Sequence, residues 1–519
     1  MKKKFVIVGG GTAGWLSALY AKQTFPEHDI TLIESSEIGI LGAGEGSTPS
    51  FVALLDYLKI PLDFLIKNTQ STIKTSIRFT NWSQNANFYH HGFNEATNDN
   101  LGDFFIKDRI QSFDYSGPSL SHFFIKDNKF IDNNDFVLKL GESKKIPFIF
   151  NNNVNIHNNV IGDFDQYGRF AVHFDAKNLA SVLSFIGQER GIKLINSKVV
   201  DFTFIDSDIE SIILENEQII KTDFVIDCTG FSRLIIGKLY KSEWKSYSES
   251  LPMKKALPFF IKNNDITKIE PYTDSIAMNY GWMWKIPLQH RYGCGYVFDS
   301  DFINEEDAVE EIKTFLGFEP EFPRGSKGTF NFSPGCYKEI WIGNCIAIGL
   351  SSSFIEPLEA TSIMHSILIL KRLFSYKYNL FNRKKEYQKR FNEKILAEFE
   401  QIVDIIYLHY MTDKKTNKFW SDFTKNNKIP KSLEEKIYYL NNAFMTEEEC
   451  QSLWGPESYY LIAKGIGFLD KEYFKNVYNI NNFSKYEELR LSQELVQNRM
   501  LLNFIGHYDF IKYMGGFKI

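Results

Sequence analysis

Cysteine is scarce and unpatterned in this sequence, which holds five in 519 residues. No two of them form a Cys-x-x-Cys pair, so the sequence indicates neither a disulfide framework nor a zinc site. It also lacks any run of about 18 apolar residues, and no membrane-spanning helix is expected. The apolar run that begins at Phe5 meets three glycines after four residues, too soon for the core of a signal peptide. We therefore expect a reducing, cytoplasmic location.

Basic residues are not in excess either. Lys and Arg number 59 against 64 Asp and Glu, so a net charge of −5 gives no electrostatic footprint for nucleic acid. An apolar content of 44% and a charged content of 24% are ordinary for a globular protein, and the length allows about two to four domains. The 47 phenylalanines and 26 tyrosines favour either aromatic-lined pockets or simply an aromatic-rich core.

A glycine loop near the N-terminus is typical of dinucleotide binding. Residues 5–8 have the pattern of a buried parallel strand, residues 15–23 that of a helix and residues 30–34 that of a second strand, which together make a βαβ unit. In the loop Gly9-x-Gly11-x-x-Gly14, the glycines permit a tight turn, close approach to a pyrophosphate and packing of helix on strand.

The acidic residue that such a site requires is also present. Glu34 lies twenty residues after the last glycine, where it can accept a hydrogen bond from a ribose hydroxyl. The free N–H groups at the helix start can bind phosphate. The alternative is a glycine turn that binds no ligand.

Two further glycine-containing strand ends favour FAD over a nicotinamide cofactor. They are Asp227-Cys-Thr-Gly-Phe231, at the end of a strand predicted at 224–228, and Gly343–Gly349, inside a buried strand predicted at 340–350. Only one Gly-x-Gly-x-x-Gly occurs, so a separate NAD(P)H flavin reductase is expected to supply reduced FAD, although single-component flavin hydroxylases also lack a second fingerprint. The predicted fold is α/β, with an FAD-binding Rossmann-like domain of the flavin monooxygenase type.

The rest of the chain divides into β-rich and helical parts. Residues 196–227 alternate as in a β-sheet. The flavin domain is expected to be discontinuous and to carry a β-sheet insertion, with inserted residues at about 85–165. Apolar spacing is helical from about 358 to 410, and the last hundred residues are also predicted to be mainly helical. The Asn-rich stretches 94–100 and 151–159 are predicted surface loops.

Motifs spread over residues 5–410 resemble one family, the flavin-dependent halogenases of the tryptophan halogenase type. The most specific combination is Lys74 together with Trp282-x-Trp284-x-Ile286-Pro287. The other segments that carry the resemblance are Gly9–Trp15, Gly42–Pro49, Phe79–Trp82, His173–Ala176, Asp227–Gly230, Glu270–Pro287 and Ile348–Ser362.

The resemblance implies that the oxidant is made at the flavin and then held by an amine beside the substrate. Reduced FAD and O₂ would convert halide to hypohalous acid, which crosses a tunnel to an aromatic substrate. Lys74 would hold or capture this oxidant, and Glu359 would stabilise the cationic ring or accept its proton. Without the resemblance, Lys74 would be interpreted as a solvated charge on a strand and Glu359 as a carboxylate at a helix N-terminus.

The resemblance also assigns binding residues. The N–H groups of Thr361 and Ser362 would bind halide at the start of a helix. Trp282, Trp284, Ile286 and Pro287 would shield the flavin from organic substrate, with core packing as the alternative. The residues assigned to FAD are Gly9, Gly11, Thr12, Ala13, Gly14, Glu34, Gly44, Ser47, Thr48 and Gly349.

One departure lies in the halide segment. The family commonly has a serine between the glutamate and the threonine, and this chain has Ala360. The lost hydroxyl makes the site less polar. We therefore expect bromide and iodide to be used at least as well as chloride.

The substrate residues depart further from the tryptophan-specific members, which use a His and a Phe near Tyr-His-x-Phe and a C-terminal cluster of two tyrosines, a glutamate and Phe-Trp. His90 matches, but Gly92 takes the Phe position, with Phe93 next to it. An alignment on Trp454 places Glu449 at the glutamate, Leu453 at the Phe, and Asn442 and Ala443 at the tyrosines. An indole, phenol or related heteroarene is expected rather than free tryptophan. As an alternative, His90 is a packed loop histidine.

These interpretations predict two regions. Residues 1–84 and 165–380 would form a discontinuous FAD- and halide-binding domain, and residues 85–164 and 381–519 a mainly helical substrate-binding region. An FAD-dependent aromatic hydroxylase and an inactive flavin-binding protein are the alternative functions. The first needs no Lys74, and retention of Lys74 and Glu359 argues against the second. A homo-oligomer is left open.

Overall fold

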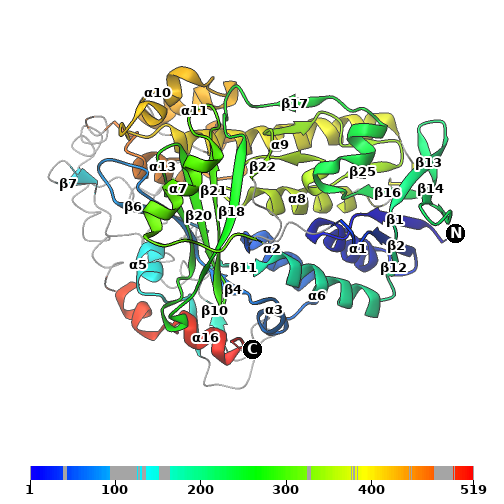
Figure 1. The fold of residues 1–519 in the computed structure, drawn as a ribbon, viewed down its shortest axis with the longest axis horizontal. Helices are drawn as coiled ribbons and strands as arrows, with labels where there is room; N and C mark the ends of the chain where they lie inside the picture. The colour runs from blue at the N-terminus through cyan, green and yellow to red at the C-terminus, as the bar shows by residue number, and fades with distance from the viewer. Residues whose placement is uncertain are drawn as a thin grey trace. The chain divides into compact units, whose positions relative to one another are not determined.

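A six-stranded sheet is the centre of the first of two units in this computed structural model (Figure 1). Its strand order is β12-β2-β1-β16-β25-β24, and β24 alone of these strands is antiparallel to its neighbour. The last four residues of β1 (Lys4–Val8) are buried and apolar, as expected for a parallel strand covered on both faces. The other strands are β2 (Asp29–Glu34), β12 (Lys193–Asn196), β16 (Phe224–Asp227), β24 (Trp341–Ile342) and β25 (Cys345–Ala347).

The two units are discontinuous in sequence. The structure describes residues 2–38, 44–93, 136–150, 168–323, 329–375, 384–442, 447–470 and 497–517, with shorter pieces between them. Unit 1 contains Met1–Ser71, His173–Ser248 and Asn331–Phe399, and unit 2 contains Thr72–Val172, Glu249–Phe330 and Glu400–Ile519. The loops predicted at 94–100 and 151–159 lie outside the described residues.

Helices of unit 1 flank the parallel sheet. α1 (Thr12–Thr24) and α6 (Ala176–Glu189) pack closely, because a Cβ at Gly187 would lie 2.6 Å from the ring of Trp15. The side chain of Asp175 caps α6 by accepting from the N–H of Asn178 at 3.0 Å. The remaining elements of this unit are α2 (Pro49–Tyr57), α3 (Leu62–Thr69), α8 (Thr361–Ser375), β3 (Gly44–Gly46), β13 (Val199–Ile205), β14 (Asp208–Leu214), β15 (Ile219–Lys221), β17 (Trp244–Ser246), β23 (Gly335–Tyr337), β26 (Ser353–Phe354) and the short helices η2 (Gly230–Ser232), η3 (Leu234–Leu239) and η5 (Gly349–Ser351).

A seven-stranded sheet dominates unit 2, in the order β22-β18-β21-β20-β19-β5-β6. Only β19 and β5 among the pairs with described register are parallel, and the others are antiparallel. The strands are β5 (Ser76–Thr80), β6 (Phe88–Gly92), β18 (Lys255–Lys262), β19 (Tyr272–Ala277), β20 (Gly281–Pro287), β21 (Arg291–Phe298) and β22 (Phe330–Asn331), and β4 (Thr72–Lys74) precedes β5.

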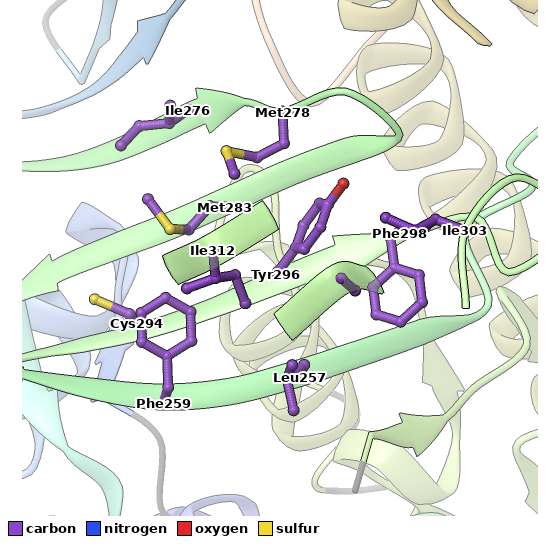
Figure 2. Close-up of a cluster of buried hydrophobic side chains, with 11 residues drawn as sticks. Leu257, Phe259, Ile276, Met278, Met283, Cys294, Tyr296, Phe298, Ile303 and Ile312 are labelled. Atoms are coloured by element: carbon purple, nitrogen blue, oxygen red, sulfur yellow. The ribbon is translucent and has the colours of Figure 1, made fainter. Parts of the chain in front are cut away.

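One face of this sheet packs against α7 (Glu305–Leu316). Figure 2 shows the cluster, in which Met283 and Phe259 of the sheet and Ile312 of α7 belong to one buried apolar group. α7 begins at a capping Asn304 and three acidic residues and ends at Gly317, whose φ of 73° is left-handed.

The C-terminal part is mainly helical in the described residues. None of the described helices is long and apolar enough to cross a membrane. The helices of the C-terminal part are α9 (Lys385–Tyr410), α10 (Lys418–Asn426), α11 (Lys431–Asn442), α12 (Glu447–Cys450), α13 (Pro456–Gly465) and α16 (His507–Tyr513). Much earlier in the chain lie α5 (Phe136–Glu142) and the short strands β7 (Ile125–Lys126), β8 (Lys129–Phe130), β9 (Phe148–Phe150), β10 (Phe164–Gln166) and β11 (Ala171–Asp175).

The predicted βαβ unit and the helical character of 358–410 are confirmed, the latter as α8 and α9. The single strand predicted at 340–350 is wrong, because Gly343, with φ at 55°, turns the chain between β24 and β25. Residues 249–330 belong to the same compact unit as Lys74 and not to the unit of the glycine loop, because β19 pairs with β5. The functional division into flavin and substrate regions stays a prediction.

Candidate active site

Three distant segments meet at the carboxyl ends of adjacent strands in unit 1. They follow β1, β16 and β25, which are neighbours in the sheet. A Cβ at Gly9, where φ is 115°, would lie 2.1 Å from the carbonyl oxygen of Cys228, and a Cβ at Gly349 would lie 2.8 Å from the Cβ of Ala13. The glycines are therefore needed for close approach of the three segments, at the edge where α/β sheets bind nucleotides.

Gly11 differs from the other loop glycines because its surroundings are open. Within the described part of the chain, apart from Gly11 and its immediate neighbours, no atom lies within 4 Å of a Cβ placed there, whereas a Cβ at Gly14 would lie 1.9 Å from the carbonyl oxygen of Gly9. Gly11 is the N-cap of α1 and supplies no side chain to its first-turn N–H groups. The open space and the uncapped helix start fit the pyrophosphate of FAD.

Glu34 ends β2 beside this loop. A Cβ at Gly10 would overlap its carboxylate, 1.5 Å from Oε2, so the loop needs a glycine there as well. Burial raises the pKa of Glu34, and a hydrogen bond from Trp15 partly offsets that effect. A partly buried carboxylate at this place suits a hydrogen bond from a ribose hydroxyl.

Asp227 is a structural residue that sequence reasoning did not single out. It is fully buried, and its carboxylate accepts from the N–H groups of Thr229, Ile235 and Ile236, each at 3.0 Å, and from the Thr229 hydroxyl at 2.7 Å. Burial raises its pKa, and these donors oppose the rise. The Asp-x-Thr spacing, typical of a side-chain turn, was the available signal.

The second predicted FAD segment begins at β3, which pairs with β11. In this pairing Gly44 lies opposite Asp175 and Glu45 opposite Phe174. Burial, with a further contribution from the charge of Asp175, raises the pKa of Glu45 to about 7. Ser47 and Thr48 are buried just before α2, while Gly42 and Ala43 lie outside the described residues. Contact of Gly44, Ser47 and Thr48 with FAD stays a prediction.

The predicted halide segment forms the start of α8. Thr361, the first residue of the helix, is fully buried, and its hydroxyl has no hydrogen-bond partner among the residues that the structure describes. Ala360 just before it has a left-handed φ of 54° and no side-chain oxygen to cap the helix. The first-turn N–H groups of Thr361 and Ser362 therefore lack a cap from residue 360, as an anion site requires. Glu359 is also buried, at 5% exposure.

Lys74 ends β4 in unit 2 and is completely buried. Its exposure is 0%, so its interpretation as a solvated strand charge is wrong. The Nζ atom lies 5.2 Å from the centre of the Phe93 ring, which brings together two residues predicted for catalysis and substrate binding. Burying an amine is costly, and such positions are often functional. Its pairing with Glu359 stays a prediction.

Strand register places the two tryptophans opposite the α7 cluster. Met283 enters that cluster, and alternation along β20 sends Trp282, Trp284 and Ile286 to the other face. The exposures of Trp282 and Trp284 are 0% and 6%, and their ring centres are 6.2 Å apart. Ile286 and Pro287 are buried as well. Shielding of the flavin by this group stays a prediction.

His90 lies on the α7 face, away from the tryptophans. Its Nδ1 is 2.9 Å from the Ser76 hydroxyl, its Nε2 is 3.2 Å from Oε1 of Glu142, and it has no exposed surface. The hydrogen bond from His90 is the main cause of the lowered pKa of Glu142. The alternative interpretation, a packed histidine, describes its surroundings, and substrate stacking by His90 is not supported.

Its neighbour His91 lies on the tryptophan face. Register connects His91 through Ile77 to Thr273, and alternation along β19 puts Thr273 on the same face as Ser275, the partner of Trp284. The spacing His91-x-Phe93 was the signal that sequence reasoning missed, because two adjacent histidines allow two alignments. His91 is 3.1 Å from the Ser458 hydroxyl of α13.

The remaining predicted substrate residues lie on or just after α12. Glu449 belongs to that helix, and Leu453 and Trp454 follow in the turn before α13, all three half-buried. The thiol of Cys450 contacts the carbonyl oxygen of Trp454 at 3.3 Å. Ala443 lies outside the described residues. Because His91 contacts α13, this segment is next to β6, but its contact with substrate stays a prediction.

Comparison with known proteins covers nearly the whole chain. The model of the tryptophan halogenase family matches residues 4–481. Tryptophan 7-halogenase RebH of Lentzea aerocolonigenes is 29% identical over 496 residues, 90% of each chain. Tryptophan 6-halogenase SttH of Streptomyces toxytricini is 27% identical, over 84% of this chain and 83% of its own.

A solved structure shows the same relation. BrvH, a flavin-dependent halogenase from Brevundimonas sp. BAL3, superposes with a TM-score of 0.77 at 26% identity, over 99% of each chain. Together with the glycine loop and its open Gly11, these matches confirm the α/β flavin-binding fold and the resemblance drawn from the motifs. The chain belongs to the tryptophan halogenase family, a family of flavin-dependent enzymes.

Proposed function

We propose that this enzyme transfers electrophilic halogen through Lys74 to an electron-rich aromatic ring. When bound, reduced FAD would give two electrons to O₂, and halide would give two more, so that hypohalous acid and water are released. A separate NAD(P)H flavin reductase would deliver that cofactor. The role of the chain is then to bind halide, to exclude substrate from the flavin and to hold the oxidant at one atom.

The observation that carries this proposal is the complete burial of Lys74. A neutral amine can react with hypohalous acid to form a nitrogen–halogen bond and release water, and a charged one can donate a hydrogen bond to it. The Phe93 ring, whose centre lies 5.2 Å from Nζ, is one of the groups that enclose this amine. Water, which would compete for the oxidant, is kept from a group with 0% exposure.

The halide would bind at the start of α8. The proposal is supported by the buried hydroxyl of Thr361, which has no partner in the described part of the chain, and by the absence of a side-chain cap at Ala360. Because residue 360 supplies no hydroxyl, weakly hydrated halides lose little on entering the site. We expect bromide to compete at least equally with chloride when both are supplied at one concentration, and Ala360→Ser to move the product ratio toward chloride. A clear preference for chloride in the unmodified enzyme would contradict this part.

The test of the central proposal is Lys74→Met, which keeps the length of the side chain and removes the amine. The enzyme is supplied with a flavin reductase, NADH, FAD, O₂, bromide and a panel of indoles and phenols, and products are read by mass spectrometry. Halogenated product should disappear, while FAD binding persists and a soluble phenolic dye still reports hypobromous acid.

A matched control is Lys436→Met. Lys436 is another buried lysine of unit 2, and its amine lies 3.0 Å from the carboxylate of Asp404. This variant should keep halogenating in proportion to the protein that remains folded. Normal halogenation by Lys74→Met would refute the proposal, and hydroxylated product would point to a flavin hydroxylase instead.

The substrate is proposed to be an indole, phenol or related heteroarene other than free tryptophan. Support comes from Leu453 and Asn442, which replace aromatic positions of the tryptophan-specific members. His91 and Phe93 are the proposed ring contacts, in place of His90, with Trp454 and Glu449 beside them. Turnover of free tryptophan faster than every other member of the panel would refute this assignment.

A further inference from the structure

A histidine from the far end of the chain binds the strand that carries Lys74. His507, the first residue of α16, has 0% exposure. Its Nε2 accepts a hydrogen bond from the N–H of Ile73 at 2.9 Å, and its Nδ1 lies 3.3 Å from the carbonyl oxygen of Ile269. Ile73 directly precedes Lys74 in β4, and Figure 1 shows α16 beside that strand.

The two contacts determine the state of the ring. A backbone N–H can only donate, so Nε2 must be unprotonated, and a carbonyl oxygen can only accept, so Nδ1 must carry the hydrogen. Protonation of Nε2 would replace the bond to Ile73 with a repulsive contact. Burial lowers the pKa of His507 to about 3, so the neutral form persists at the pH of ordinary assays.

The backbone on either side of Ile73 is also held. The hydroxyl of Thr72 donates to the carbonyl oxygen of Pro287 at 2.7 Å, and the N–H of Thr75 donates to that of Pro271 at 2.7 Å. Residues 72, 73 and 75 are thus each bound by a different segment. The bond at residue 73 is the one supplied by a side chain outside the sheet.

We propose that His507 is a positioning residue for Lys74, acting through the backbone of Ile73. The inference rests on the proposed role of Lys74 and extends it. This role requires no contact of His507 with halide or substrate. A lysine amine ends a flexible stem, so a displacement of its backbone moves the amine away from the point where oxidant and ring meet, and such displacements reduce rates strongly.

Two substitutions separate the two hydrogen bonds. His507→Gln places an amide oxygen near the Nε2 position, where it can still accept from Ile73. His507→Asn is shorter and can replace only the Nδ1 contact with Ile269. Each keeps one bond and loses one, so a merely structural role predicts similar effects, whereas positioning predicts that only His507→Asn is impaired.

The measurement is the ratio of halogenated product to hypobromous acid trapped by a soluble dye, with bromide and the same substrate panel. For His507→Asn we expect this ratio to fall roughly ten-fold or more, with KM for the aromatic substrate little changed, and for His507→Gln to stay within about three-fold of the unmodified enzyme. Equal ratios in the two folded variants would overturn the inference.

Failure of this inference is distinguishable from failure of the proposed function. If Lys74→Met lacks product while both His507 variants behave alike, only the positioning role is wrong. If Lys74→Met halogenates normally, the proposed function is wrong and the His507 inference falls with it. Should His507→Asn fail to fold, a ratio for His507→Gln more than about three-fold below the unmodified enzyme overturns the inference, and a ratio within that range supports it.

Discussion

The lowered pKa of His507 predicts a pH-dependent stability that one substitution should remove. The ring has a pKa of about 3 in the folded protein against an ordinary value of 6.5. Between these values the unfolded chain binds more protons, so the free energy of unfolding falls as the pH drops below about 6.5. The two pKa values correspond to a loss of about 2 kcal/mol between pH 7 and pH 5, and of about 3 kcal/mol by pH 4.

Urea unfolding of the unmodified enzyme and of His507→Gln, each at pH 7 and pH 5, measures this effect. Glutamine does not titrate, so the stability difference between the two proteins should shrink by about 2 kcal/mol at the lower pH. Asp404 and Glu45, whose pKa values are raised to about 6 and about 7, act in the opposite direction but are present in both proteins. A difference that stays constant from pH 7 to pH 5 would show that His507 is not a neutral buried ring.

Four further predictions concern two loop glycines, the glycine beside Trp284 and a buried thiol. Gly11→Ala should leave the FAD-free protein nearly as stable but weaken FAD binding at least about ten-fold in a fluorescence titration, because its methyl group enters the open space at the loop. Gly14→Ala should lower the free energy of unfolding itself by about 1–3 kcal/mol or more, and equal stability of the two variants would contradict the geometry. Gly295→Ala places a Cβ 2.1 Å from the Trp284 ring and should cost about 1–3 kcal/mol in urea unfolding, an effect that Trp284→Phe should partly relieve. The thiol of Cys345, buried and with a raised pKa, should resist iodoacetamide until the protein unfolds, and rapid labelling of the native state would refute its burial.

Patterns of neighbouring residues correctly predicted the elements that such patterns alone determine. The βαβ unit follows from an apolar run, a glycine loop and a second apolar run, all within the first 34 residues. The strand predicted at 340–350 fails at Gly343 and Asn344, which turn the chain between β24 and β25, and this turn is also held from another part of the chain. Asn344 accepts from the N–H of Ile209 and donates to its carbonyl oxygen, each at 2.8 Å, so β14 stabilises a turn in what reads as a continuous apolar strand.

The face of the sheet that carries Trp282 and Trp284 shows a second limit of sequence reasoning. Adjacent residues of a strand point to opposite faces, so a one-residue difference in alignment exchanges His90 for His91. In the sequence alone, the histidine of the Tyr-His pattern can be aligned with His90 or with His91. Only the register from β6 through β5 and β19 to β20 decides which of them shares a face with Trp284.

The sequence identifies Lys74 as a candidate residue but does not predict what holds its strand in place. The motif identifies the lysine, yet its strand is held by Pro271, Pro287 and His507, and the last of these is 434 residues from Ile73. No local pattern reports a bond between a ring nitrogen and a backbone N–H at that separation. If amine placement depends on that bond, we expect changes in α16 to alter how efficiently halogen reaches the ring, while the residues of unit 1 that are predicted to bind flavin and halide stay unchanged. The ratio of halogenated product to trapped hypobromous acid, rather than the affinity for flavin, is therefore the quantity that should respond to changes in the structure around Lys74.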